Sequence, residues 1–342
     1  MYRIAKEKLN DLFALIAETQ ALYLPTDIAD GSAEFRPYAA GVKMSEALKT
    51  VRSAKDFFFP PTENLVNFRK NGGKIEVVDP RRECEDFVLF GVRACDARSF
   101  DILDRVFLSE PVDTYYQNRR AHATVVVLAC SRPTTSCFCT TFGIDPTNPG
   151  GDVSAWMTED AVYFDAHTEK GNAFIKRAIP LLTEDSGDAV ANQQTETKKI
   201  LEKLPFASLS TDAFGGGKTD TYFSSEEWAS LSEACLGCGT CTFLCPTCQC
   251  YDIRDYDTGH GICRFRCWDS CMYSDFTKMA SGNPRLTQKE RFRQRFMHKL
   301  VYFPENNDGI FSCVGCGRCV EKCPISMNIV KVMKTLGKEA RS

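Results

Sequence analysis

The chain has 342 residues, enough for two domains, and a net charge of -3 with a pI of about 5.9, which gives no indication of nucleic-acid binding. Eighteen cysteines are many for this length, yet no signal-peptide core and no apolar run of membrane-spanning length occurs. We therefore expect a cytoplasmic protein without a membrane span, in which cysteines bind metal rather than form disulfides.

The N-terminal half of the sequence predicts alternating helices and strands. Apolar residues recur at helical spacing over residues 3–17, and a second helix is expected over residues 44–54. Continuous apolar runs over residues 87–90 and 124–129 are typical of strands that are buried on both faces. Asp96 is the expected N-cap of a helix between these strands. This order is a βαβ unit, which indicates an α/β domain with parallel strands.

Four cysteines should meet at one edge of that sheet. Cys95 follows the first strand, Cys130 ends the second, and Cys137 and Cys139 lie in the next loop. Because ligands bind outside the carboxyl ends of parallel strands, we expect a third metal site there, most simply a [4Fe–4S] cluster. The alternative is that these thiols are small buried side chains of the core. Cys84 precedes the first strand and is expected at the opposite edge.

A glycine-rich break at residues 214–217 marks the expected domain boundary. It divides the chain into an α/β domain over residues 1–220 and a second domain over residues 221–342. The polar segment 183–198 is expected to be a mobile connection or a poorly packed helix start. In the second domain, the segment 289–302 has a helical pattern.

Two cysteine runs in the second domain carry the most specific signal. Residues 235–246 and 313–324 both follow the pattern C-x2-C-x2-C-x3-C-P. In this motif three cysteines bind one [4Fe–4S] cluster, and the fourth binds the other cluster of the pair. The predicted ligands are Cys235, Cys238, Cys241 and Cys323 for one cluster, and Cys313, Cys316, Cys319 and Cys245 for the second. Structural zinc, the alternative, uses two C-x2-C pairs for each site, which is not the pattern found.

The insert between the two runs holds five further cysteines: Cys248, Cys250, Cys263, Cys267 and Cys271. The last three are spaced i, i+4, i+8, which predicts a stripe on one face of a helix. Together with Cys248 or Cys250, these three cysteines could form a fourth metal site, although a thiol-lined core face beside the clusters is the favoured interpretation.

Charged residues lie close to both runs. A basic stretch follows the insert, at Arg291, Arg293, Arg295, His298 and Lys299. Such stretches are usually solvated faces, and a docking patch for an acidic redox partner is the less favoured interpretation. Arg318 in the second run stands where Thr240 stands in the first. A positive charge favours the electron-rich reduced state, so the second cluster is expected to have the higher potential.

Several stretches together resemble one known family. They are residues 91–96 with 102–107, Cys130 with Cys137 and Cys139, residues 245–250 with 268–271, and the two cysteine runs. Over roughly residues 55–330 the chain is similar to the beta subunits of cytosolic sulfhydrogenases and to the related iron–sulfur subunits of anaerobic sulfite reductases. The resemblance implies an iron–sulfur protein beside a flavoprotein that handles NAD(P)H. The second domain also resembles the α-helical ferredoxin type of fumarate reductase iron–sulfur subunits.

The leading functional hypothesis is electron transfer in a multisubunit oxidoreductase. The resemblance implies two kinds of partner, an FAD/NAD(P)-binding flavoprotein subunit and a terminal hydrogenase, sulfite reductase or heterodisulfide-reductase-like subunit. The sequence has no G-x-G-x-x-G motif after a strand and no P-loop, so no flavin or nucleotide is expected in this chain. No catalytic set stands out, so we expect no substrate-level active site.

Two alternative functions stay open. One is a catalytic disulfide-reducing iron–sulfur subunit, which the lack of an adjacent Cys-Cys pair disfavours. The other is a zinc-stabilised interaction module.

Overall fold

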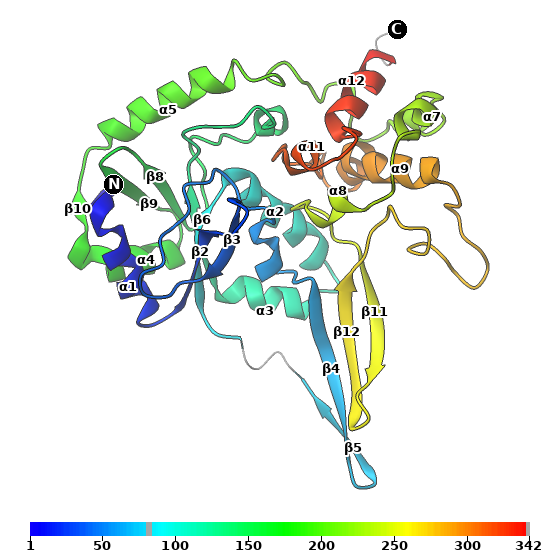
Figure 1. Ribbon diagram of the computed structural model, residues 1–342, viewed down its shortest axis with the longest axis horizontal. Coiled ribbons are helices and arrows are strands. Elements are labelled where there is room, and N and C mark those ends of the chain that lie inside the picture. Colours follow the sequence, from blue (N-terminus) through cyan, green and yellow to red (C-terminus); the bar gives the residue numbers. More distant parts are fainter. Residues whose placement is uncertain (80–83, 340–342) are drawn as a thin grey trace.

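A computed structural model describes residues 1–79 and 84–339, and its largest element is a mixed eight-stranded sheet (Figure 1). The strand order is β10-β1-β9-β8-β7-β6-β2-β3. The strands are β1 (Tyr2–Ala5), β2 (Ala21–Asp27), β3 (Ala33–Pro37), β6 (Phe87–Val92), β7 (Ala123–Leu128), β8 (Val153–Met157), β9 (Ala161–Ala166) and β10 (Thr183–Glu184). The neighbours β2, β6, β7 and β8 run parallel, which confirms the predicted parallel strands.

Helices cover both faces of this sheet. They are α1 (Leu9–Ala17), α2 (Ala94–Phe107), α3 (Thr114–His122) and α4 (Glu169–Ala178). Every residue of β6 and β7 is buried. Successive side chains of a strand point to opposite faces. Accordingly, Val88 and Phe90 belong to the core with α1 and α4, whereas Phe87 and Leu89 belong to the core with α2 and α3.

Two helix predictions in this region differ from the structure. The helix predicted over residues 3–17 begins only at Leu9, because β1 pairs with β9. The helix predicted over residues 44–54 is absent, and only a short 3-10 helix, η2 (Ala54–Phe57), forms at its end. Backbone groups of that segment bond elsewhere: Arg93 donates to Ala47 O at 3.3 Å, and Arg318 donates to Thr50 O at 3.0 Å.

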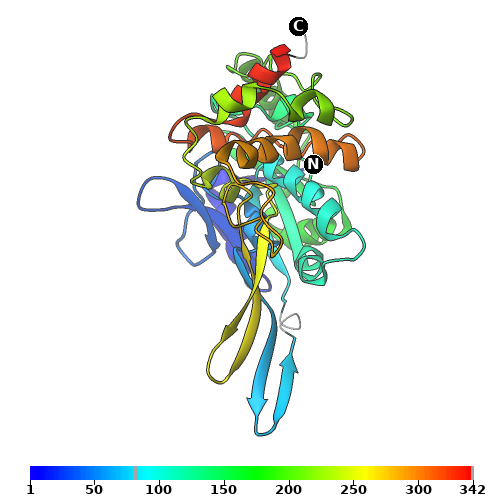
Figure 2. The same ribbon diagram turned by 90° about the vertical axis from the view of Figure 1, so that its right-hand side faces the viewer.

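A second sheet of four antiparallel strands projects from the body (Figures 1 and 2). It has the order β11-β12-β4-β5, with β4 (Thr62–Asn71), β5 (Lys74–Val78), β11 (Tyr251–Asp257) and β12 (Gly261–Trp268). Two strands come from each side of the boundary expected near residue 220, so the division into domains stays a prediction. The predicted helical stripe of cysteines is wrong: Cys263 and Cys267 lie in β12, and Cys271 follows it.

The C-terminal region is built mainly from short helices. They are α6 (Thr219–Phe223), α7 (Glu227–Ser232), α8 (Thr240–Phe243), α9 (Gln288–Met297), α10 (Phe303–Asn306), α11 (Arg318–Glu321) and α12 (Ile329–Glu339), and a π-helix, η6 (His298–Tyr302), continues α9. Trp228, Phe292, Phe296 and Met333 contribute to their shared core. This confirms the helical pattern predicted over residues 289–302.

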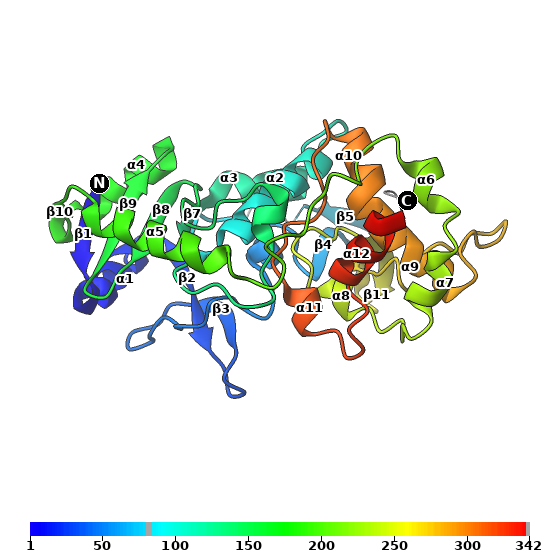
Figure 3. The same cartoon turned by 90° about the horizontal axis from the view of Figure 1, so that it is seen from above.

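The polar segment 183–198, predicted as either a mobile connection or a poorly packed helix start, forms β10 and most of a regular helix, α5 (Asp188–Leu201). This helix runs from the large sheet towards the C-terminal helices (Figure 3). No helix among the described residues is long and apolar enough to cross a membrane.

Candidate metal centre

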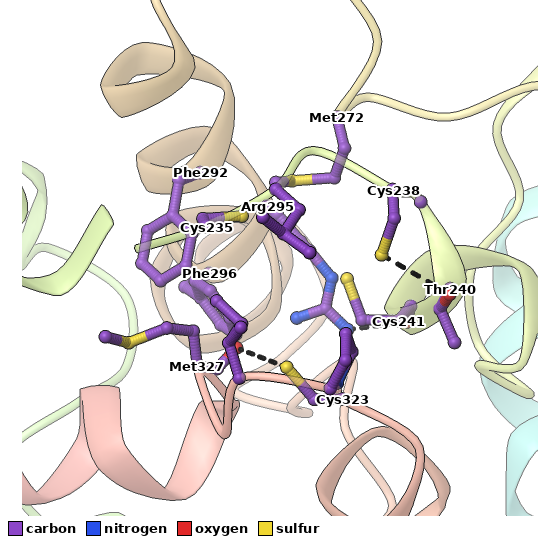
Figure 4. Close-up of a pocket in the computed structure, with 14 residues that line it drawn as sticks. Cys235, Cys238, Thr240, Cys241, Met272, Phe292, Arg295, Phe296, Cys323 and Met327 are labelled. Carbon is purple, nitrogen blue, oxygen red and sulfur yellow. Dashed lines mark hydrogen bonds between the residues drawn. The ribbon is translucent and has the colours of Figure 1, made fainter. Parts of the chain in front are cut away.

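The structure brings the two cysteine runs together around two neighbouring cavities. The first cavity is lined by Cys235, Cys238 and Cys241 of the first run and by Cys323 of the second run. Figure 4 shows the four sulfur atoms around the guanidinium group of Arg295. Apolar side chains complete the wall, namely Met272, Phe292, Phe296 and Met327. Water is therefore largely displaced from this side of the sulfur atoms.

The second cavity has the reciprocal composition. It is lined by Cys313, Cys316 and Cys319 of the second run and by Cys245 of the first run. The two runs thus exchange their fourth cysteines, as the motif leads us to expect. Ligation of iron by these eight thiols stays a prediction.

Glycines shape the turns that hold these cysteines. Gly239 and Gly317 precede α8 and α11 with φ values of +74° and +79°, a region that favours glycine. A Cβ atom on Gly239 would lie 2.6 Å from the Tyr273 hydroxyl, and one on Gly317 would lie 2.5 Å from the carbonyl oxygen of Ser136. Larger residues would therefore displace both cysteine loops.

Two members of the basic stretch are buried in the walls of the cavities. Arg295 is 2% exposed and lines both cavities, and Lys299 is 3% exposed and lines the second. The interpretation of this stretch as a solvated face is therefore wrong for these two residues. Their i, i+4 spacing on a helix that also buries Phe292 and Phe296 is the signal that sequence reasoning missed.

The two cations differ in their hydrogen bonding, which is incomplete for Arg295. Arg295 donates from Nη2 to Cys241 O at 2.7 Å, while its Nε and Nη1 are buried without a partner. Lys299 donates to Thr247 Oγ1 at 2.8 Å and to Ser312 O at 2.9 Å. Buried charge and unpaired donors are costly unless an anion with acceptor atoms faces them. An iron–sulfur cluster with thiolate ligands is such a group, so the donor set fits it.

Removing either cation should lower cluster potentials selectively. Lys299→Met should lower only the potential of the second cluster, whereas Arg295→Met should lower both. A unit charge contributes about 2 kcal/mol at ~8 Å and an effective dielectric constant of ~20, equivalent to roughly 90 mV per electron. Redox titration followed by EPR measures both shifts. Arg295→Lys keeps the charge and is the control, and equal shifts of both clusters in Lys299→Met would contradict the prediction.

The four N-terminal cysteines also lie close to one another. Cys95 is in the first turn of α2, Cys130 follows β7, and Cys139 begins a 3-10 helix, η4 (Cys139–Phe142). The Cys139 thiol interacts electrostatically with Cys130, Cys137 and Cys316, and the Cys95 thiol interacts with Cys139 and Cys316. The group therefore lies beside the second cavity, at the carboxyl ends of β6 and β7. Whether it binds a cluster stays a prediction.

Three further observations bear on metal binding in this part of the chain. Cys84 interacts with Arg119 and Asp86 instead of the four N-terminal thiols. Within residues 1–79 and 84–339, no three His, Cys, Asp or Glu side chains are arranged to hold a single metal ion. Burial raises the pKa of the Cys139 thiol to about 12, so this thiol is protonated at neutral pH in the absence of a cation.

Replacing Cys137 by serine should remove about one cubane of iron, roughly four atoms, and leave the two C-terminal clusters intact. Serine keeps the size of the side chain but removes the thiolate. Iron and acid-labile sulfide analysis measures the loss, and Cys84→Ser is the matched control. An unchanged iron content would mean that the third site is absent or does not use Cys137.

A buried ion pair fastens the second cysteine run to the α/β region. Arg318 donates to both carboxylate oxygens of Asp96, at 2.6 and 2.7 Å, and both side chains are nearly inaccessible to water. Lys49 adds a hydrogen bond to Cys316 O at 2.9 Å. Asp96 is therefore not the N-cap of α2, a position that Arg93 occupies. The charge of Arg318 is also compensated, so it cannot by itself set the potential of the second cluster.

Comparisons with known proteins define the class and then the family. Residues 234–327 match the family model of a 4Fe-4S dicluster domain, so this region is an iron–sulfur domain of that type. Over 290 residues the chain is 34% identical to Sulfhydrogenase 2 subunit beta of Pyrococcus furiosus, with 83% of each chain covered. The protein therefore belongs to the sulfhydrogenase beta-subunit family, and the resemblance inferred from its motifs is confirmed. No solved structure matches the chain.

Proposed function

We propose that this chain relays single electrons between an FAD/NAD(P)-binding flavoprotein subunit and a terminal redox subunit. The terminal subunit would be a hydrogenase, a sulfite reductase or a heterodisulfide-reductase-like protein. The observation that carries the proposal is that Arg295 lines both cysteine cavities. Clusters in the two cavities would be close neighbours, as a relay requires.

The arrangement of the thiols supports a path through the chain. Cys238 of the first cavity is exposed, and the adjacent Leu236 is 68% exposed, so an electron can reach or leave the first cluster at the surface. The second cavity lies next, and Cys316 in its wall neighbours Cys139 of the N-terminal group. With a third cluster on that group, the path would continue into the α/β region.

The clusters would supply one-electron redox chemistry, and the chain would bind, shield and tune them. Eight cysteines would hold two [4Fe–4S] clusters, and the N-terminal four would hold a third. Arg295 and Lys299 would stabilise the reduced states. The helices around the two cavities would form a unit of the α-helical ferredoxin type within residues 221–342, attached to the α/β domain of residues 1–220. We place the complex in the cytoplasm.

The proposal assigns NAD(P)H chemistry to a partner, which can be tested directly. The isolated chain should not reduce a dye with NADH or NADPH, because it has no phosphate-binding glycine loop of the dinucleotide type. Adding the flavoprotein subunit of the same complex should allow NAD(P)H to bleach the cluster absorbance of the chain. Rapid NADH-dependent dye reduction by the pure chain would contradict this assignment.

A further inference from the structure

Two thiols outside the predicted cluster ligands are in contact. Cys250 immediately precedes β11 and Cys271 follows β12, so the base of this hairpin brings them together. Their side chains are hydrogen-bonded to each other. Asp269 N donates to Cys250 O at 3.0 Å and fixes the two arms of the hairpin at this point. A pair of thiols held this way needs little movement to form a disulfide.

The pair lies directly beside the candidate metal centre. Ser270 Oγ is hydrogen-bonded to Thr242 Oγ1 of α8 at 2.8 Å, and Met272 lines the first cavity. Cys271 therefore sits between two residues that contact the first cysteine run. On the other side, Cys248 is hydrogen-bonded to Cys245, a predicted ligand of the second cluster. The thiol pair is thus within the same packed region as both cavities.

Two buried lysines, Lys55 and Lys299, favour a negative charge on the Cys250 thiol. Lys55 donates to Cys248 O at 2.9 Å and its Nζ lies 3.6 Å from the centre of the Trp268 ring. The hydrogen bond from Cys271, assisted by Lys299 and Lys55, lowers the pKa of Cys250 to about 7. The same hydrogen bond and burial raise the pKa of Cys271. Cys250, the less buried of the two, has the properties of an attacking thiolate and Cys271 those of a resolving thiol.

The other cysteines of the insert do not join this group. Cys263 donates to Asn64 at 3.1 Å on the projecting sheet, and Cys267 interacts with the exposed Arg254. Cys248, Cys250 and Cys271 of the insert meet here, and the thiol beside them, Cys245, is a predicted ligand of the second cluster, so a further closed site would lack its fourth ligand. The geometry therefore favours thiol chemistry over a fourth metal site.

We propose that Cys250 and Cys271 are a redox-active dithiol that reduces a small disulfide substrate with electrons from the two clusters. The proposal rests on the proposed electron-transfer function. The Cys250 thiol loses its proton, and the thiolate attacks the substrate disulfide, forms a mixed disulfide and expels one substrate thiolate, which takes up that proton. Cys271 then loses its proton, attacks Cys250 and releases the second thiol, which leaves a Cys250–Cys271 disulfide. Two electrons, delivered one at a time, and two protons restore the dithiol, so one disulfide is converted into two thiols.

Thiol mapping of the cluster-loaded chain tests the proposal without relying on activity. The protein is equilibrated anaerobically in dithiothreitol buffers of stepped potential, alkylated, digested and analysed by mass spectrometry. A Cys250–Cys271 disulfide should form and disappear reversibly as the potential changes. Because the couple transfers two electrons, the ratio of disulfide to dithiol should change tenfold for about every 30 mV. Cys263, Cys267 and Cys84 should stay alkylated throughout. Absence of that disulfide at every potential would overturn the proposal.

Serine variants distinguish disulfide reduction by Cys250 and Cys271 from cluster binding and from electron transfer. Cys250→Ser and Cys271→Ser should keep the iron content and the dithionite-reduced EPR signals of the wild type, yet lose dithionite-dependent reduction of oxidised glutathione. Cys263→Ser is the matched control and should keep that reduction. Loss of iron in either variant, or unchanged glutathione reduction, would overturn the proposal. A wild-type chain whose clusters fail to accept electrons would instead count against the proposed relay.

Discussion

Replacing Cys323 by serine is expected to remove the cluster of residues 235–241 and to spare the cluster of residues 313–319. The reason is that Cys323 lines the first cavity, although it belongs to the second run. A cubane that loses one thiolate ligand is not retained, while the other keeps all four of its thiols. Iron content should fall by about four atoms, and one of the two C-terminal EPR signals should disappear.

The reciprocal variant is the control for this experiment. Cys245→Ser should remove the other signal, because Cys245 lines the second cavity. The signal that shifts in Lys299→Met identifies the second cluster independently, since Lys299 lines only that cavity. Retention of the first cluster in Cys323→Ser, with loss of the second, would show that the cysteines do not cross between the runs.

Replacing Asp96 by alanine should destabilise the protein strongly, by about 3–5 kcal/mol, because it leaves the Arg318 guanidinium buried without its partner. Denaturant titration followed by tryptophan fluorescence and by cluster absorbance measures the loss. The exposed pair Arg98–Asp101 provides a matched comparison. Asp101→Ala should change stability by less than about 1 kcal/mol.

A double variant separates lost pairing from lost packing. Asp96→Ala with Arg318→Met removes both charges and should recover most of the stability, since no unpaired ion is left buried. If the double variant is as unstable as Asp96→Ala alone, the ion pair is not the cause. In either case the variants show whether the second cysteine run depends on the α/β region for its position.

Features specified by nearby residues could be predicted from the sequence. Both cysteine runs were recognised because their ligands are closely spaced, and the exchange of Cys245 and Cys323 follows from the motif itself. The strands β6 and β7 were predicted because two-sided burial requires continuous apolar runs. Family membership followed from motifs of the same local kind.

Features that depend on distant partners could not be predicted. The hairpin of β11 and β12 forms an extended sheet only because β4 pairs with β12, and neither segment indicates the other in the sequence. The sequence predicts Asp96 as an N-cap, because its ion-pair partner Arg318 is 222 residues away in the chain. For Cys250 and Cys271 the sequence indicates only metal ligands or core thiols, because the whole hairpin separates them in the chain.

The second cluster is still expected to have the higher potential, but for a different physical reason. Arg318 was expected to raise the potential of the second cluster, but Asp96 compensates its charge. Lys299 lines only the second of the two cavities and has no carboxylate among its hydrogen-bond partners. Its uncompensated positive charge is therefore expected to raise the potential of the second cluster above that of the first. The higher potential of the second cluster therefore stays a prediction, now attributed to a different residue.

Electron transfer through iron–sulfur clusters is tested by a redox titration of the anaerobically purified wild-type chain, combined with iron, zinc and acid-labile sulfide analysis. We expect at least about eight iron and eight sulfide per chain, and about twelve of each with the third cluster. We also expect reversible one-electron reductions for each cluster. Zinc in place of iron, without acid-labile sulfide, would contradict the electron-transfer function and favour a structural metal module.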